Sequence, residues 1–535
     1  MASAALMFSG ELFPYQHEAV DRILTDRRIL VAYSMGTGKT VLTLAAMEQL
    51  LGEGTIRRCV IMVPSSLKWQ WAQAVATFTD TPTRTVTLRG VDLVVPTADV
   101  CTLISGSPQQ RRAQWQRAHR TDYVIAGYSA VLHDWADLRA LQFDALILDE
   151  ATAIKTFAAR TTKRVKQLRP PVRVALTGTP LENRPEEVFS IMEWVNRDVL
   201  GRWHPFDRSY ITRNRFGGVS SYKNLELLHR NLGRAMVRKS RLDPEVAKYL
   251  PAVTYTTRAV RLDATTRTVY RAVLADVQAA MAEVVEAGGQ QVDLAAYYAG
   301  IRADGPHLAV HGKLMARLQA LRQLLDHPQL LMDSAVAYHE GKGGSAYAAS
   351  FAAGRSDLPD LTSSPKLIAL DDLVATMLAE GAKIAVFTEY RRMLPYLARR
   401  LGIDTDFVLF HGQLKSDERA SLLSKFKTDP ECRLFISTNA GGYGLDLPEA
   451  QYLINYDLPY SAGVLAQRNT RHVRASSIFD RVHVINLVVE DSIEERVQAT
   501  LARREALALA VVDGSGVGTL DMDVGSLSQH IENAR

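Results

Sequence analysis

The chain has 535 residues, 47% of them hydrophobic and 23% charged, and its formal net charge is +5. This length predicts several domain cores, and the composition is too apolar for a disordered protein. No apolar stretch reaches the ~18 residues of a membrane span, and the start lacks the basic lead of a secretory signal. The cysteines, Cys59, Cys101 and Cys432, have no paired spacing for zinc or disulfides. We therefore expect a protein of a reducing cytoplasm, neither secreted nor membrane-bound.

A glycine-rich turn follows the first predicted strand, residues 29–32. Such a turn between a strand and a helix points backbone N–H groups at a phosphate, while its lysine supplies positive charge and its hydroxyl residue a metal ligand. Tyr33 stands where the common pattern has its first glycine. The turn predicts a binding site for a nucleoside triphosphate, and Thr40 would also bind Mg²⁺. The predicted site is made by Gly36, Thr37, Gly38, Lys39 and Thr40.

Four more apolar runs follow, and the third of them ends in an acidic pair. Runs that are apolar at every position are typical of strands buried on both faces of a parallel sheet. The pair predicts that Asp149 holds the metal through water and that Glu150 orients the attacking water. An acidic pair can also cap a helix dipole, but Lys39 upstream favours the catalytic interpretation. The four runs are 59–63, 123–126, 145–148 and 174–177.

Residues 202–241 contain ten Lys or Arg against two acids, with aromatic residues between them. This pattern is typical of a surface that meets a polyanion, and equally of a solvated arginine-rich insertion. Helical spacing prevails over about 185–331, notably at Leu314, Leu318, Leu321, Leu324 and Leu325. We expect a helical insertion that closes the first lobe. The aromatic residues are Trp203, Phe206, Tyr210, Phe216 and Tyr222.

A second series of buried strands is predicted after a segment rich in Gly, Ala and Ser. The same rhythm as in the first part predicts a second parallel-sheet lobe. The Gly, Ala and Ser segment reads as a linker, and the weakly patterned end as a frayed tail. The predicted strands are 383–388, 407–410, 434–438, 452–456 and 482–489.

Several motifs, in order over about residues 11–500, resemble the Swi/Snf-like ATPases of helicase superfamily two. Leu176-Thr177-Gly178-Thr179-Pro180-Leu181-Glu182-Asn183 resembles the third motif of that family. Segments around Gln16, Ser65-Ser66-Leu67-Lys68-Trp69 and Tyr128 resemble earlier motifs. In the second half, residues 437–447 are similar to the fifth motif, and Gln467, Arg471 and Arg474 reproduce the spacing of the sixth.

The resemblance implies roles for these residues. Gln16 would read adenine. Arg471 and Arg474 would reach the triphosphate from the opposite lobe as arginine fingers, with Gln467 orienting water or phosphate; the alternative is a pair of surface arginines in salt bridges. Thr177, Gly178 and Thr179 would couple the nucleotide state to the nucleic-acid face. The backbone of DNA would be contacted by Ser65, Ser66, Lys68, Thr438, Asn439 and Gly441.

The resemblance also implies the fold and its division along the chain. We predict an α/β fold with two RecA-like parallel-sheet lobes and a helical insertion after the first. The predicted division is an ATP-binding lobe over 1–195, the helical insertion over 196–335, a linker over 336–364, the second lobe over 365–512 and a tail over 513–535.

The predicted function is a DNA-dependent ATPase that uses ATP and Mg²⁺ and moves along duplex DNA without sequence specificity. The alternatives are a strand-unwinding helicase on DNA or RNA, and a nucleotide-gated DNA clamp or scaffold with little turnover. The family usually has an acidic pair at Tyr33-Ser34, and His at Thr152 and Val473, so coupling between hydrolysis and movement can differ here. We expect a bacterial or phage protein that is monomeric without DNA.

Overall fold

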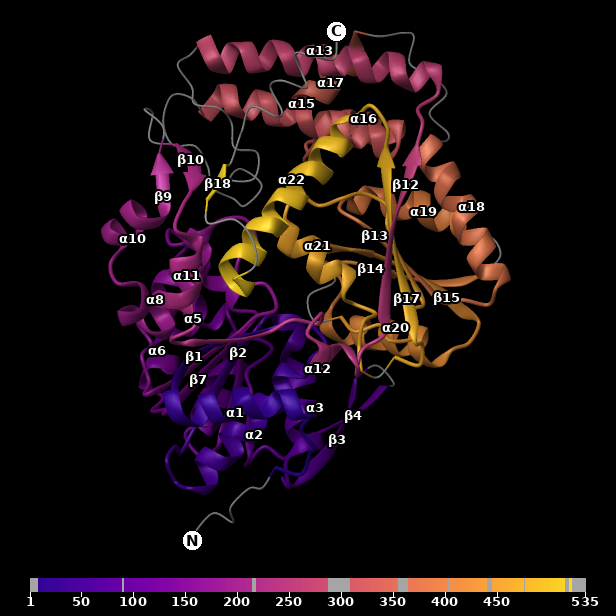
Figure 1. The fold of residues 1–535 in the computed structure, drawn as a ribbon. Coiled ribbons are helices and arrows are strands. Elements are labelled where there is room, and N and C mark those ends of the chain that lie inside the picture. The colour runs from indigo at the N-terminus through magenta and orange to yellow at the C-terminus, as the bar shows by residue number, and fades with distance from the viewer. Residues whose placement is uncertain are drawn as a thin grey trace.

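Two α/β lobes make up most of the computed structural model, and a group of long helices lies beside the second (Figure 1). The structure describes residues 8–88, 91–213, 218–286, 308–354, 364–402, 405–439, 445–475, 477–514 and 519–521. Within these ranges no helix has the length and apolar character that crossing a membrane requires. The three cysteines are free and buried.

The first lobe is built on a seven-stranded sheet in which every neighbouring pair is parallel. All five strands predicted for this lobe are present, and two shorter ones are added. In spatial order the strands are β11 (Met236–Lys239), β1 (Arg28–Tyr33), β8 (Val172–Leu176), β7 (Ala145–Asp149), β2 (Cys59–Val63), β6 (Tyr123–Gly127) and β5 (Cys101–Leu103).

Helices cover both faces of this sheet, which explains the continuous apolar runs. In β1, Ile29 and Val31 pack into one core and Leu30 and Ala32 into the other. The first core is closed by α1 (Pro14–Asp26), α2 (Lys39–Gly52), α3 (Lys68–Phe78) and α12 (Pro244–Ala247). The second is closed by α4 (Pro108–Ala118), α5 (Ala130–His133), α6 (Trp135–Ala140), α7 (Arg160–Val165), α8 (Pro185–Val195), α9 (Arg197–Leu200), α10 (Trp203–Tyr210) and α11 (Leu225–Leu232).

The second lobe has a six-stranded parallel sheet that contains all five strands predicted there. Its strands are, in order, β12 (Ala252–Val260), β17 (Arg481–Val489), β16 (Tyr452–Asn455), β13 (Ile384–Thr388), β15 (Cys432–Thr438) and β14 (Asp406–Phe410). Its helices are α18 (Pro365–Ala379), α19 (Leu394–Leu401), α20 (Ser416–Thr428), α21 (Ala462–Asn469) and α22 (Ile493–Ala508). The predicted pair of α/β lobes is thus confirmed.

The division between the lobes differs from the predicted one. Residues 196–335 are not a helical insertion on the first lobe, because β11 completes the first sheet and β12 forms the edge of the second. The helices that pack beside the second lobe begin only after β12, and their core includes Val489 and Ile493 of that lobe. They are α13 (Ala264–Glu286), α15 (Leu308–Asp326), α16 (Pro328–His339) and α17 (Ala346–Ala353). The five leucines with helical spacing are all buried in this core, on α15.

The predicted linker and tail also contain ordered structure. Part of the predicted linker is α17, whose Ala348 and Phe351 pack into the same helical core, while 355–363 lie outside the described residues. In the predicted tail, Leu520–Asp521 (β18) pairs with β10 (Val219–Tyr222), which also pairs with β9 (Ile211–Arg213). A further hairpin, β3 (Thr83–Leu88) and β4 (Val91–Pro96), extends from the first lobe.

The chain passes between the lobes twice. Residues 240–251 lead from β11 to β12. Helix α22 leads back. Leu507 near its end, and Val511 and Val512 in the turn Leu509–Asp513 that follows it, belong to the core of the first lobe. An ion pair between Arg238 Nε and Asp513 Oδ1, 2.6 Å apart, fixes the end of this second connection to the first lobe.

A buried carboxyl on α2 gives the first lobe a pH-dependent stability. Burial raises the pKa of Glu48 to about 7; Oε1 accepts the Tyr123 hydroxyl at 2.5 Å, and Oε2 has no partner among the described residues. Because the folded pKa lies above the unfolded value, ionisation of Glu48 lowers stability progressively as pH rises toward 7. We expect Glu48→Gln to raise the thermal midpoint by ~2–4 °C at pH 8, and by less at pH 5. Thermal unfolding at both pH values, with the exposed Glu53→Gln as control, checks this; an equal gain at both would contradict it.

Candidate nucleotide site and nucleic-acid surface

The glycine-rich turn forms a loop between β1 and α2 at the carboxyl edge of the first sheet. Gly36 and Gly38 adopt left-handed backbone angles, with φ of +80° and +78°. A side chain at Gly38 would also collide with Gln16 Nε2. Lys39 Nζ donates to the carbonyls of Tyr33 at 2.9 Å and Ser34 at 3.1 Å. The loop has the form of a phosphate-binding loop, and its lysine side chain is hydrogen-bonded to carbonyl groups of the same loop.

Two residues on α1 hold this loop in place. Gln16 Nε2 donates to Thr37 O at 2.9 Å, and its Oε1 accepts the Phe13 N–H at 2.8 Å. The Tyr15 hydroxyl also donates to Thr37 O. The buried Tyr33 hydroxyl donates in turn to Tyr15 O at 2.8 Å, so the tyrosine that replaces the usual first glycine fixes α1 against β1. In this structure Gln16 supports the loop; adenine recognition by Gln16 stays a prediction.

The acidic pair lies at the end of β7, on the same sheet edge. Glu150 has φ of 50°, a strained angle for a residue with a side chain, and its Oε2 is buried without a partner among the described residues. Asp149 Oδ1 accepts the Glu150 N–H at 2.9 Å, and Asp149 Oδ2 accepts the indole N–H of Trp71 at 2.7 Å. Both oxygens of Asp149 are therefore oriented by fixed donors.

The charges of the loop and the acidic pair act on one another. Burial lowers the pKa of Lys39 to about 8, although Glu150 and Asp149 oppose this shift. Burial and the charge of Asp149 raise the pKa of Glu150 to about 7. Burial also raises the pKa of Asp149, against the hydrogen bond from Trp71. This is the environment of a site whose charges are completed by a ligand.

The third motif lies directly against the loop. A Cβ at Gly178 would lie 2.8 Å from Met35 Cγ and 3.6 Å from Lys39 Nζ, so glycine permits this approach. The buried Thr177 Oγ1 accepts the Thr179 N–H at 3.1 Å. Glu182 forms an ion pair with Lys155 at 2.5 Å and accepts the Ser461 hydroxyl of the second lobe at 3.0 Å. The motif thus touches both the loop and the opposite lobe.

The sixth motif of the second lobe reaches the phosphate loop of the first. A Cβ at Gly36 would lie 2.5 Å from Val473 O and 3.0 Å from Arg474 Nη1, and the Thr470 hydroxyl lies 3.3 Å from Met35 Sδ. The charge of Arg474 acts on Lys39, and that of Arg471 on Glu150. The structure therefore brings Arg474 to the glycine-rich loop and places Arg471 where its charge acts on Glu150.

Both arginines also have partners in their own lobe. Arg474 Nε lies 2.6 Å from Asp446 Oδ1, and Arg471 Nη1 donates to Leu445 O at 3.2 Å. Gln467 is buried on α21. The neighbouring Arg468, which the sequence did not single out, lies in a buried network in which its Nη1 donates to Asn455 Oδ1 at 3.1 Å and its Nε to Asn439 Oδ1 at 2.9 Å.

The residues predicted to contact DNA belong to both lobes. Ser65 and Ser66 form a single turn, η1 (Ser65–Leu67), before α3, and Lys68 begins that helix. In the second lobe, Thr438 ends β15 and is buried, and Asn439 is held by Arg468 and Glu389. Gly441 lies outside the described residues.

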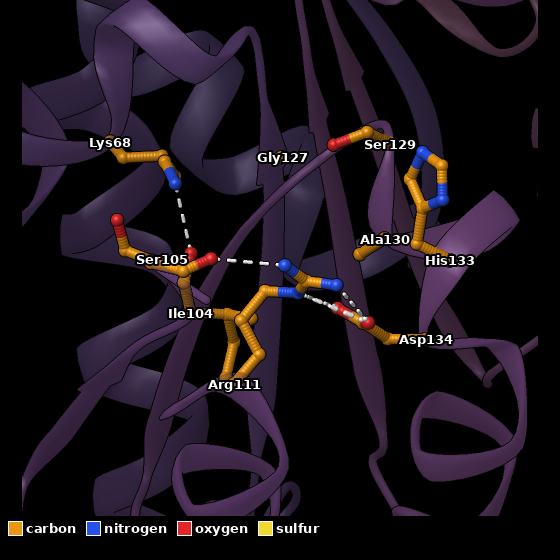
Figure 2. Close-up of a pocket in the computed structure, with 10 residues that line it drawn as sticks. Lys68, Ile104, Ser105, Arg111, Gly127, Ser129, Ala130, His133 and Asp134 are labelled. Carbon is orange, nitrogen blue, oxygen red and sulfur yellow. Dashed lines mark hydrogen bonds and ion pairs between the residues drawn. The ribbon is translucent and has the colours of Figure 1, made fainter. Parts of the chain in front are cut away.

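A polar pocket of about 160 Å³ opens beside Lys68 (Figure 2). Lys68 Nζ donates to Ile104 O at 2.9 Å, and Arg111 pairs with Asp134 at 2.9 Å. Burial and the charge of Arg111 lower the pKa of Lys68. Lys68 and Arg111 line this hollow at strand ends together with the Asp134 carboxylate that pairs with Arg111, and a lysine at such a place is of the kind that contacts a phosphate group. The remaining lining residues are Ser105, Gly106, Gly127, Ser129, Ala130 and His133.

The described aromatic residues of the basic segment pack against the first lobe. Phe206, Tyr210 and Tyr222 are at most 5% exposed and belong to the core of the first lobe. Trp203 packs edge-on against Phe189. Phe216 lies outside the described residues. Of the two interpretations of this segment, a surface with stacking aromatic side chains is therefore not supported by the described aromatics.

Comparison with known families decides the identity. The family described as SNF2-related domain matches residues 15–330, and the helicase conserved C-terminal domain matches residues 365–476. The chain belongs to the SNF2-related family of ATP-dependent helicase-type enzymes.

Relatives of this SNF2-related chain include the putative ATP-dependent helicase/translocase YwqA of Bacillus subtilis, 25% identical over 94% of this chain and 48% of that protein. The chain spans about half or less of the length of the curated relatives it matches. The Pyrococcus furiosus Hef helicase domain has 19% identity and a TM-score of 0.52 over 91% of this chain and 97% of that one, which supports the predicted fold. A Sulfolobus solfataricus SWI2/SNF2 ATPase core in complex with dsDNA aligns over 96% of both chains at 22% identity and a TM-score of 0.41.

Proposed function

We propose that this SNF2-related protein is a DNA-dependent ATPase that moves along duplex DNA. The observation that carries the proposal is the contact of the sixth motif with the phosphate loop, at Gly36. Both lobes contribute charged groups to one site, so ATP hydrolysis would depend on how closely the second lobe approaches the first. The name of the Bacillus subtilis relative, a helicase/translocase, supports the same class of activity.

The chain's own residues suit the binding of ATP and its metal. The glycine cradle and Lys39 would bind the phosphates, and the orphaned Glu150 Oε2 is available to a water. Thr40 supplies a hydroxyl and Asp149 a carboxylate of the kind that Mg²⁺ takes directly or through water. When bound, Mg²⁺ would neutralise the charge of the phosphate oxygens.

The residues that we assign to catalysis would position the attacking water and stabilise the charge of the phosphate groups. Glu150 would hold the attacking water and take up its proton, while Lys39 would exchange the carbonyls of Tyr33 and Ser34 for the phosphates. Arg471 and Arg474 would present planar guanidinium groups to the transferred phosphoryl. For that task Arg474 would have to exchange Asp446 for phosphate oxygens, which ties turnover to the position of the second lobe.

The proposal is tested by ATP turnover with duplex DNA, single-stranded DNA and RNA in parallel, with wild type and Glu150→Gln. Duplex DNA is expected to stimulate wild type most. Stimulation by RNA alone would overturn the preference for DNA. Stimulation by single strands together with separation of a labelled duplex would favour an unwinding helicase.

The pocket beside Lys68 gives a further prediction about DNA binding. Lys68→Ala is expected to weaken binding of duplexes of different sequence to the same degree, because a phosphate contact reads no base. It should also lower the slope of log Kd against log salt by about one. Fluorescence anisotropy over a range of salt measures both, with the exposed Lys342→Ala as control. A loss confined to one sequence, or an unchanged salt slope, would contradict a phosphate contact.

A further inference from the structure

A tryptophan of the first lobe contacts the carboxylate that we assign to the metal. Trp71 lies on α3, is 1% exposed, and donates its indole N–H to Asp149 Oδ2 at 2.7 Å. The two residues are 78 positions apart in the chain, so the contact is a product of the fold. Tyr128 adds a hydroxyl that donates to Asp149 O at 2.8 Å. The end of β7 is thus held from two other elements.

An indole N–H is well suited to orient this carboxylate. It donates without carrying a positive charge, so it leaves the negative charge of Asp149 available to a metal. Because Asp149 Oδ1 also accepts the Glu150 N–H, a rotated carboxylate would disturb Glu150 as well.

The same helix connects Asp149 to the pocket beside Lys68. Lys68 begins α3 and lines the pocket, and Trp71 follows three residues later, within one turn. Figure 2 shows Lys68 reaching into this pocket from its helix. A group bound in the pocket would act on the first turn of α3, and the indole lies in that turn.

We propose that Trp71 is a positioning residue that holds Asp149 for metal binding and connects the Lys68 pocket to the nucleotide site through α3. The proposal rests on the proposed function, since it takes Asp149 as the metal-binding carboxylate and the pocket as a phosphate site. It assigns to Trp71 no contact with the substrate itself.

The test is Trp71→Phe in the full chain, with two matched controls. Trp194 is also fully buried in this lobe and donates its indole N–H to Leu168 O at 3.0 Å, while the buried Trp115 indole N–H has no partner among the described residues. Trp194→Phe and Trp115→Phe therefore repeat the loss of ring size with and without the loss of a hydrogen bond. Trp71→Tyr serves as a second variant without the indole N–H.

The first measurement is binding of a fluorescent ADP analogue as Mg²⁺ is titrated. Trp71→Phe and Trp71→Tyr are expected to raise the half-saturating Mg²⁺ concentration ~10-fold, the effect of losing a group that orients a metal ligand. Binding without Mg²⁺ should stay as in wild type. In an Asp149→Asn background, Trp71→Phe should shift the titration no further. An unchanged titration, or an equal shift in either control, would overturn the proposal.

The second measurement is the ratio of ATP turnover with and without duplex DNA at saturating Mg²⁺. Trp71→Phe is expected to lower this ratio ~3- to 10-fold while DNA binding without nucleotide stays as in wild type. An unchanged ratio would overturn the link to the pocket. The wild-type protein separates the two claims. If duplex DNA does not stimulate ATP turnover by wild type, the proposed function fails. If duplex DNA stimulates wild type and Trp71→Phe to the same degree, only the role of Trp71 fails.

Discussion

Glu150→Gln is expected to lower DNA-stimulated ATP turnover at least ~100-fold while nucleotide affinity changes by no more than a few-fold. Glutamine keeps the size of the side chain but cannot take a proton from the attacking water, and a positioned general base contributes about 10²–10⁴ in rate. Glu150 is the carboxyl whose buried Oε2 has no partner among the described residues. Steady-state turnover and equilibrium binding of a nucleotide analogue measure the two effects separately.

Glu193→Gln is the matched control for this experiment. Glu193 lies on α8 in the same lobe and pairs with Lys166 at 2.7 Å, outside the nucleotide site. Its substitution should leave turnover near that of wild type. If Glu150→Gln instead retained full function on DNA while the basic segment 202–241 were still required, the nucleotide-gated clamp would be the better interpretation.

Arg471→Ala and Arg474→Ala are each expected to lower turnover ~10³-fold or more, with nucleotide binding largely intact. An arginine that reaches a phosphoryl group from across a cleft stabilises charge that develops in the transition state, and contributes about 10³–10⁵. The contact of Arg474 with the position of a Cβ at Gly36 supports this assignment. Arg474→Lys should rescue little, because an ammonium group lacks the planar pair of donors.

Arg481→Ala provides the control, because Arg481 lies at the exposed start of β17 in the same lobe. Single-turnover and binding measurements separate the two steps. Lost nucleotide binding with unchanged turnover at saturating ATP would count against the finger role.

The central strands of both sheets, and the sheet edge that carries the candidate site, could be predicted because each is marked by a short stretch of sequence. A strand buried on both faces is apolar at nearly every position, as 145–148 and 384–387 are throughout. The phosphate loop, the acidic pair and the third motif each follow such a strand, and the carboxyl ends of parallel strands meet at one edge. Their proximity therefore followed from the order of the segments.

The lobe boundary could not be predicted in the same way. Strand β11 has four residues and ends in Arg238 and Lys239, so it reads as part of the basic segment. Strand β12 is an edge strand that is exposed over most of its length, and its sequence is rich in Thr. Neither carries the continuous apolar signal of a central strand, and their places in two different sheets depend on long-range pairing.

The roles of single side chains were harder still to predict. Trp71 and Trp69 differ little in the sequence, yet Trp71 alone of the two is buried against Asp149. Arg468 stands between two motif residues and has a structural network of its own. In the basic segment, Phe206 and Tyr222 are core residues because α10 and β10 pack on the first lobe. The only sequence signal for Trp71 was its place one turn after Lys68.

The two passages of the chain between the lobes restrict how the molecule can move. A single connection would let one lobe swivel freely about it. Here residues 240–251 and the segment that follows α22 both join the lobes, and the second is anchored by buried Val511 and by the ion pair of Asp513 with Arg238. Any displacement of the second lobe must therefore deform both connections, and the contact of the sixth motif with Gly36 depends on both.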